Sequence, residues 1–177
     1  MPGIAVKPAV AGELQRQLNH ELSAAHSYLA LAAWCEDRNF KGFGHYLHKQ
    51  SEEEREHAER IMKHLIDRGV LAELQQVAAP KTKFTSILEI AKHAQAMEQA
   101  NTVGINSAYE AALREKDYPA QVMLQWFITE QVEEENWADE MVERVEQASC
   151  AGGLMDLDRH ITRYLTDEVI GAEEKEE

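Results

Sequence analysis

The chain has 177 residues, 44% of them hydrophobic and 28% charged, with four prolines and nine glycines. This length and composition are those of one folded domain and exclude a disordered chain. The formal net charge of −14 at pH 7 argues against nucleic acid or an anionic membrane as a partner and suits cations, although composition alone favours a solvated acidic face as its explanation.

Hydrophobic residues recur every three or four positions along four long segments, which is the pattern of amphipathic helices. The first expected helix runs from about Ala9 to Asp37. A tight turn at residues 39–42 leads into the second helix, which extends to about Arg68, and Gly69 supplies its C-terminal stop.

The second half of the chain repeats this arrangement after a long connection at residues 69–83. Connections of this length are uncommon in compact domains, so we expect it to run the length of a bundle and start the third helix at the far end. The third helix is expected over residues 84–116, and Pro119 is suited to the start of the fourth. Gly152 and Gly153 are expected to end the fourth helix, before a short amphipathic helix over residues 154–166.

These elements predict an all-α fold, an antiparallel four-helix bundle with a long crossover between helices two and three and a short fifth helix. We expect one domain over residues 1–170. The acidic tail at residues 171–177 is expected to be disordered.

Six polar residues interrupt the apolar stripes of the four helices, and their spacing repeats. The two sets are Glu21, Glu54 and His57 in the first half, and Glu98, Gln131 and Glu134 in the second. Each second member follows the first of its set by 33 residues, and each third member follows it by 36. Because each set lies at a similar distance from its own interhelical turn, antiparallel packing brings both to the middle of the bundle.

Ionisable groups in an apolar seam are costly unless they are paired or bind metal, so this pattern predicts a metal centre. Di-iron carboxylate bundles use one Glu from each of two helices and Glu-x-x-His from each of the other two. Glu54 and His57 fit that motif, whereas Gln131 and Glu134 form a degenerate copy of it. Four glutamates balance two divalent cations, and oxygen-rich ligation with an imidazole suits iron that reacts with dioxygen.

Other interpretations of single residues remain open at this point. The Glu-rich stretch around Glu54 is typical of a solvated helix face, and only the repeated spacing favours metal. A second acidic set, one position off the stripe, is either an exposed shoulder or a third, looser metal site; it consists of Glu53, Glu130 and Glu133. Tyr28 lies two turns from Glu21 on the same face, and is either a core aromatic or an electron donor beside the iron.

The remaining features indicate a cytoplasmic protein. Cys35 and Cys150 are too few for a disulfide framework and match no metal-binding spacing. No apolar run approaches the roughly 20 residues that span a bilayer. The N-terminus lacks the apolar stretch of a secretory signal, so a cytoplasmic, reducing location is expected, and no membrane partner.

At these residues the chain closely resembles the bacterial non-haem ferritins. The matching stretches are LNHELSAAHSYLALAAWC, SEEEREHAERI, AMEQA and LQWFITEQVEEE. The resemblance implies a homo-oligomeric cage of twenty-four subunits that oxidises ferrous iron with dioxygen and stores it as a ferric mineral. It also implies that the short last helix lines the fourfold axis.

The resemblance further implies a role for each site residue. Glu21 and His57 would bind one iron, Glu98 and Glu134 the other, and Glu54 would bridge them. Four residues would act on iron and dioxygen: Tyr28, Glu54, His57 and Gln131. Among them, Gln131 would hydrogen-bond bound water or oxygen species, and Tyr28 would be the redox-active neighbour. A third iron would be held by Glu53, Glu130 and Glu133.

Two departures from the related haem-containing bacterioferritins argue against haem. The Met that ligates haem there is replaced by Arg55, and a second His in the last long helix is replaced by Glu134. The competing hypotheses are a di-iron oxidase or reductase that forms no cage, and a catalytically idle cage subunit. The fifth helix speaks against the first, and the intact pair of Glu54 and His57 against the second.

Overall fold

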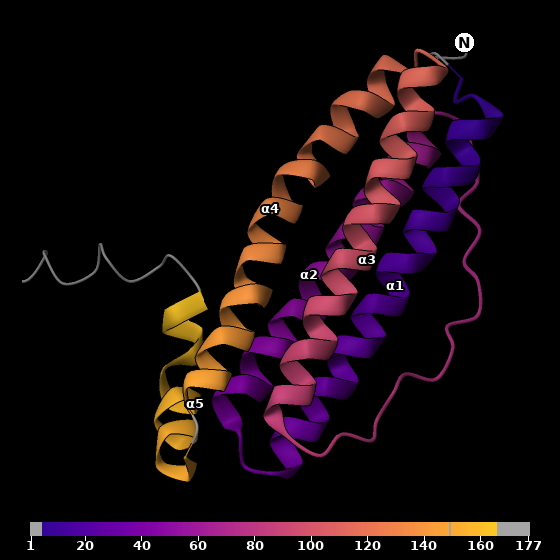
Figure 1. Cartoon of the computed structure of the whole chain (residues 1–177). Helices are drawn as coiled ribbons and strands as arrows, with labels where there is room; N and C mark the ends of the chain where they lie inside the picture. The colour runs from indigo at the N-terminus through magenta and orange to yellow at the C-terminus, as the bar shows by residue number, and fades with distance from the viewer. Residues whose placement is uncertain (1–4, 149, 166–177) are drawn as a thin grey trace, which may run out of the picture.

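Four long antiparallel helices form a bundle, with a fifth short helix beside one end (Figure 1); the computed structural model describes residues 5–148 and 150–165. The helices are α1 (Pro8–Asp37), α2 (Lys41–Asp67), α3 (Ile87–Arg114), α4 (Tyr118–Gln147) and α5 (Ala151–Leu165). α1 packs along α2 and α3 along α4, so the chain forms two helical hairpins, which meet along α1 and α3. This confirms the predicted fold class.

The crossover between α2 and α3 has no regular secondary structure and runs the length of the bundle, as expected (Figure 1). Two amide side chains of α1 hold it in place. Gln15 donates to the carbonyl of Leu71 at 2.8 Å and accepts from the N–H of Glu73 at 3.0 Å. Asn19 donates to the carbonyl of Glu73 at 2.9 Å and accepts from the N–H of Gln75 at 2.8 Å. These bonds satisfy backbone groups that an extended segment would otherwise leave without partners.

Each of three helix ends uses one residue in the left-handed conformation. Asn39 follows α1 with φ 62°, Gly69 follows α2 with φ 78°, and Lys116 follows α3 with φ 54°. Gly and Asn adopt this conformation at low cost, which explains the first two positions. Lys41 and Gly42, expected in the tight turn, instead form the first turn of α2.

The third helix begins at Ile87, three residues later than expected, because Ser86 caps it. The Ser86 hydroxyl accepts from the N–H of Glu89 at 3.2 Å, and the Glu89 carboxylate accepts from the N–H of Thr85 at 2.8 Å. This pairing resembles a capping box, except that Glu89 accepts from the residue before the N-cap, and it establishes Ser86 as the N-cap of α3.

The predicted boundary between the last two helices was wrong. α4 ends at Gln147, and Gly152 and Gly153 lie in the first turn of α5 instead of terminating α4. The expected end of the fifth helix at Thr166 and the tail at residues 171–177 lie outside the described residues.

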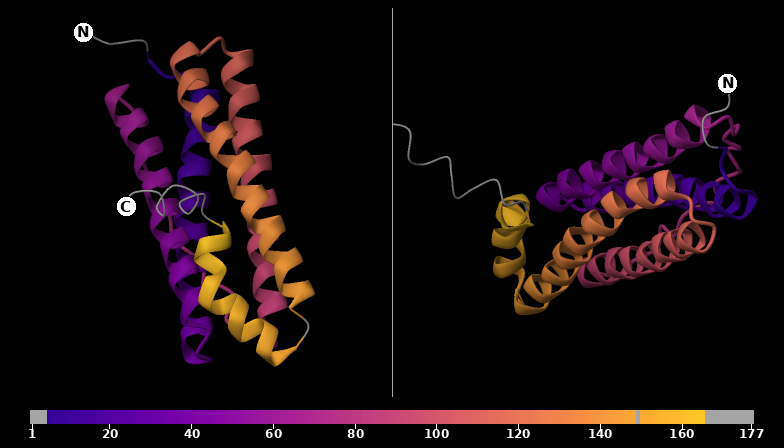
Figure 2. Two further views of the ribbon diagram at one scale, coloured as in Figure 1. Left: turned by 90° about the vertical axis from the view of Figure 1, so that its left-hand side faces the viewer. Right: turned by 90° about the horizontal axis from the view of Figure 1, so that it is seen from above.

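Helix α5 folds back from the end of α4 and packs against α2 (Figure 2). Leu157 and Ile161 are its buried residues. Asp158 accepts from the backbone N–H of Phe43 at 3.0 Å, in the first turn of α2, whose own N-cap residue makes no side-chain hydrogen bond. A Cβ at Gly42 would lie 1.7 Å from the carbonyl oxygen of Asp158, so this approach requires glycine.

The bundle core consists of two hydrophobic clusters, one near each end. The first includes Tyr28, Leu47 and Trp137, and the second includes Leu14 and Phe127. A layer of buried polar side chains separates them: Gln17, Glu21, Gln50, Glu54, His57, Glu98, Asn101 and Gln131. None of the described helices combines the length and apolarity needed to cross a membrane.

Candidate metal centre

The polar layer contains a compact set of metal-binding groups. Glu21 of α1 and Glu54 and His57 of α2 each offer one ligand atom, and these atoms lie within 4.8 Å of one another. Glu21 is 0% exposed, Glu54 4% and His57 6%. His57 and Glu54 are three residues apart on one helix face, with His57 Nδ1 3.3 Å from Glu54 Oε2. Two carboxylates and an imidazole suit iron or another divalent transition metal.

The imidazole of His57 is oriented by aromatic side chains of α4. Its ring meets Trp126 and Phe127 edge-on, with centroid distances of 5.4 Å and 5.6 Å. The guanidinium of Arg60, also on α2, stacks over the Trp126 ring, 3.8 Å from the ring centroid. The second hairpin therefore fixes a ligand that the first hairpin supplies.

Glu98 of α3 lies in the same layer and is held by two neighbours. The Tyr28 hydroxyl donates to Glu98 Oε1, which confirms that this phenol faces the polar layer. Gln131 Nε2 lies 3.4 Å from Glu98 Oε2 and 3.3 Å from the Glu98 carbonyl oxygen, donating to both. Glu134 is half-buried and accepts from Trp137 Nε1. Glu98 and Glu134 thus lie beside the tight set of three ligands and do not belong to it in this conformation.

The electrostatics of the layer favour a cation. Burial raises the pKa of Glu21 and Glu54 well above the ordinary value, and neighbouring carboxylates raise both further. Burial also raises the pKa of Glu98 to about 7 and that of Glu134 well above its ordinary value. Four carboxyl groups that resist ionisation at neutral pH would ionise readily around divalent metal, because the metal supplies the missing positive charge.

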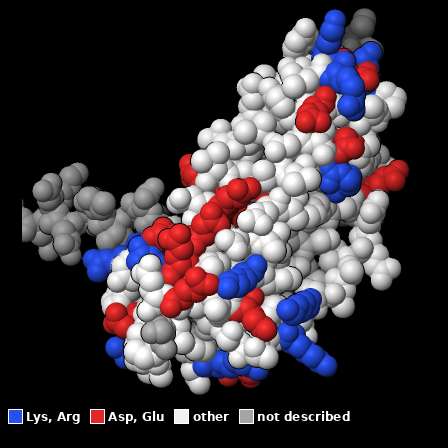
Figure 3. Space-filling model, viewed as in Figure 1, with Lys and Arg blue, Asp and Glu red and all other residues white. Residues whose placement is uncertain are grey.

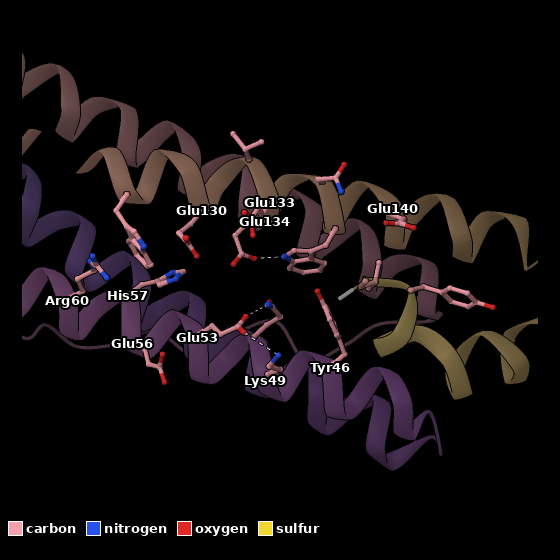
Figure 4. A pocket seen from close by; sticks show the side chains of 17 residues that line it. Tyr46, Lys49, Glu53, Glu56, His57, Arg60, Glu130, Glu133, Glu134 and Glu140 are labelled. Atoms are coloured by element: carbon pink, nitrogen blue, oxygen red, sulfur yellow. Dashed lines mark hydrogen bonds and ion pairs between the residues drawn. The ribbon is translucent and has the colours of Figure 1, made fainter. Parts of the chain in front are cut away.

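A groove of about 680 Å³ between α2 and α4 leads from the surface to this centre (Figure 4). Glu53 of α2 and Glu130, Glu133 and Glu134 of α4 line it, and Glu53 faces Glu134 across the space. On the face seen in Figure 3, acidic side chains gather along the lower half of α4, which forms one wall of the groove. The second acidic set predicted from the sequence therefore lies along one groove that also reaches His57.

One cation already lies beside Glu53. Lys49 Nζ is 3.8 Å from Glu53 Oε1, and Gln50 donates to Glu53 Oε2. A metal ion bound by Glu53 would have to compete with this ammonium group, so Lys49 weakens the attraction of the groove for cations.

Four residues around the centre were not assigned a role from the sequence: Gln17, Lys49, Asn101 and Trp137. Each has a signal in the spacing. Gln17 precedes Glu21 by one turn, Lys49 precedes Glu53 by one turn, and Asn101 and Trp137 follow Glu98 and Glu134 by three residues. Polar or aromatic residues one turn from a ligand share its helix face and are in position to contact it.

Comparison with known proteins gives a consistent result. A family model described as a ferritin-like domain matches residues 11–148. The bacterial non-heme ferritin of Staphylococcus haemolyticus is 45% identical over 123 residues, covering 70% of this chain and 74% of the relative. That of Staphylococcus aureus is 43% identical over the same length. An open pore ferritin from the hyperthermophilic archaeon Archaeoglobus fulgidus superposes with a TM-score of 0.86 at 30% identity, covering 89% of this chain and 96% of that one.

Proposed function

The chain belongs to the ferritin-like family, among the bacterial non-haem ferritins, and from this premise we propose that it stores iron after oxidising it at the buried carboxylate centre. Ferrous iron is the substrate, dioxygen the oxidant and a ferric mineral the product. Each ferrous ion gives up one electron, so two ions at one centre supply the two electrons that reduce dioxygen to the level of peroxide. The observation that carries the proposal is the compact, fully buried set of Glu21, Glu54 and His57.

We assign the first iron to Glu21 and His57, the second to Glu98 and Glu134, and the bridge to Glu54. Support for the bridge comes from electrostatics: Glu54 hydrogen-bonds Glu21, and the charges of Glu98 and Glu134 both act on it. A carboxylate influenced by both halves of the centre is the candidate that two metal ions would share.

Gln131 and Tyr28 contact Glu98 and would act at the second iron. The Gln131 amide can donate to bound water or oxygen species. Burial, followed by the charge of Glu98, raises the pKa of Tyr28 well above its ordinary value, so the phenol keeps its proton at neutral pH. An electron leaving Tyr28 would therefore be accompanied by this proton, for which Glu98 is the nearest acceptor.

We assign a third, looser iron to the groove residues Glu53, Glu130 and Glu133. They are more exposed than the central ligands, and Lys49 competes for Glu53, so weaker binding is expected. Their position between the surface and the centre suits a site through which iron passes.

Rapid mixing of the metal-free protein with ferrous iron in air tests the ferroxidase activity. We expect a fast phase that saturates at two irons per subunit and is lost in Glu54→Ala. Glu59→Ala, an exposed glutamate of the same helix, is the matched control and should retain the phase. Slow oxidation that never saturates, unchanged by Glu54→Ala, would exclude this centre as the site of oxidation.

The assembly is proposed to be a cage of twenty-four identical subunits without haem, located in the cytoplasm. In place of a haem-ligating Met, Arg55 lies on the exposed face of α2 and pairs with Glu59 at 3.8 Å. Native mass spectrometry distinguishes the cage from an oxidase of one or two subunits, and absorption spectra of protein purified from haem-producing cells test the absence of haem.

A further inference from the structure

Two buried amide side chains, Gln17 of α1 and Asn101 of α3, lie in the polar layer without being metal ligands. They are 0% and 1% exposed. Gln17 Nε2 donates to Glu21 Oε1 at 2.8 Å and to Asn101 Oδ1 at 2.5 Å. Asn101 Nδ2 donates to Glu21 Oε2 at 3.1 Å and to Gln131 Oε1 at 3.3 Å. Both oxygens of Glu21 are therefore held by N–H donors.

These contacts form one chain of hydrogen bonds across the centre. It begins at Glu21, passes through Asn101 to Gln131, and ends at Glu98, to which Gln131 donates. The chain thus joins a carboxylate of the first hairpin to a carboxylate of the second. Asn101 and Gln131 each accept a hydrogen bond with the amide oxygen and donate with the amide nitrogen, so rotation of either amide would change the partners of the other.

The amide orientation of Gln17 is fixed by its surroundings. Exchanging its oxygen and nitrogen would place the oxygen against Glu21 Oε1 and Asn101 Oδ1, which are both acceptors. In the orientation present, Gln17 Oε1 is buried and has no hydrogen-bond partner among the described residues. The unpaired oxygen costs free energy. The exchanged orientation would cost more, because it would lose both donor contacts of Gln17 and place its oxygen against two other acceptors.

Gly104 of α3 makes room for this arrangement. A Cβ at Gly104 would lie 2.4 Å from Gln17 Oε1, so any larger residue displaces the end of the Gln17 side chain. Gly104 is buried in the middle of a 28-residue helix, where glycine is otherwise unfavourable. Its presence there is explained by the space that Gln17 occupies.

We propose that Asn101 and Gln17 are positioning residues that hold Glu21 in the geometry for the first metal and link it to Gln131 and Glu98 at the second. The proposal rests on the assignment of Glu21 and Glu98 as metal ligands. Amides in the outer shell of a metal site orient the ligands, and their loss typically lowers metal affinity about 10- to 100-fold. Asn101 acts at the junction, because it donates hydrogen bonds to both Glu21 and Gln131.

Titration of the metal-free, assembled protein with Co²⁺, followed by visible absorption, tests this without turnover. The wild type is expected to bind two tight equivalents. Asn101→Leu, which keeps the branched shape and removes the donors, should weaken the first step about tenfold or more. Asn106→Leu, at an exposed position of the same helix, is the control and should leave both steps unchanged.

Gly104→Ala separates positioning from folding. The added methyl group favours the helix and offsets part of the cost of displacing Gln17, so the metal-free protein should melt close to wild type, yet displacement of Gln17 should weaken the first Co²⁺ step. In a Glu21→Gln background, Asn101→Leu should weaken the remaining binding less than threefold, because its main target is gone. A role in folding alone would weaken binding equally in both backgrounds.

The outcomes separate the two proposals. If the wild type binds no tight pair of Co²⁺ ions, the assigned centre itself is wrong. If the wild type binds the pair and both Asn101→Leu and Gly104→Ala bind it with wild-type affinity, the centre stands and the positioning role of the amides is overturned.

Discussion

Replacing Gly42 with alanine should release α5 from the bundle. The new Cβ would lie 1.7 Å from the carbonyl oxygen of Asp158, which is backbone and cannot turn aside as a side chain can. Moving α5 away exposes Leu157 and Ile161, and burial of each is worth about 1.5–3 kcal/mol. It also removes the Asp158 cap from α2, worth about 0.5–2 kcal/mol. We therefore expect a loss of about 4–8 kcal/mol in the docking of α5.

Limited proteolysis and thermal unfolding measure this effect. In Gly42→Ala the connection between α4 and α5 should be cleaved early, and the melting temperature should fall. Gly12→Ala is the matched control, because a Cβ there meets no atom within 4 Å and the position lies inside α1. It should stabilise the protein by about 0.5–1 kcal/mol. If Gly42→Ala resists protease and melts like Gly12→Ala, the packing argument is refuted.

Three further predictions concern the metal centre. Burial raises the pKa values of four glutamates, Glu21, Glu54, Glu98 and Glu134, so the folded metal-free protein binds more protons than the unfolded chain. The contribution of these groups to the free energy of unfolding is therefore present below about pH 4.5 and is lost as the pH rises towards 7 and above. Melting curves should show this loss between pH 5 and 8 without metal and much less of it with Zn²⁺; equal slopes would contradict the assignment. Tyr28→Phe should keep the saturation at two irons but abolish any tyrosyl radical seen by electron paramagnetic resonance during oxidation, and an unchanged radical would place it elsewhere. Lys49→Met should tighten the third Co²⁺ step about 1.4- to 5-fold, as expected from an exposed ion pair worth about 0.2–1 kcal/mol, whereas Lys92→Met should leave that step unchanged; equal effects of the two variants would exclude competition at Glu53.

The helices and most of the buried polar layer could be predicted from the sequence, because both depend on periodicity within a helix. The inward stripe of the first helix, with Leu14, Glu21 and Tyr28 on one face, is buried as its spacing requires. Glu54 and His57 meet because residues three apart share a helix face. The same spacing of 33 and 36 residues within each half then predicted that both sets lie at the same level along the bundle axis.

Features that depend on the register between helices could not be predicted in the same way. Gly104 carries no sign in the sequence that Gln17 lies against it, since 87 residues separate the two positions along the chain. Gly152 and Gly153 were expected to stop a helix because glycine lowers helix propensity, but α5 tolerates both in its first turn. The anchoring of the crossover by Gln15 and Asn19 likewise requires knowing the path of that segment across α1.

The division of the bundle into two hairpins has a consequence for how the protein folds. Glu21, Glu54 and His57 all belong to the hairpin of α1 and α2, whose helices are joined by a short turn, so their contacts form early and require little loop-closure entropy. The three ligands are therefore expected to come near one another first, and the second hairpin, which orients His57, then packs against them. We expect a divalent ion to stabilise this hairpin and to attract Glu98 and Glu134 of the second hairpin, so that the metal would favour assembly of the bundle.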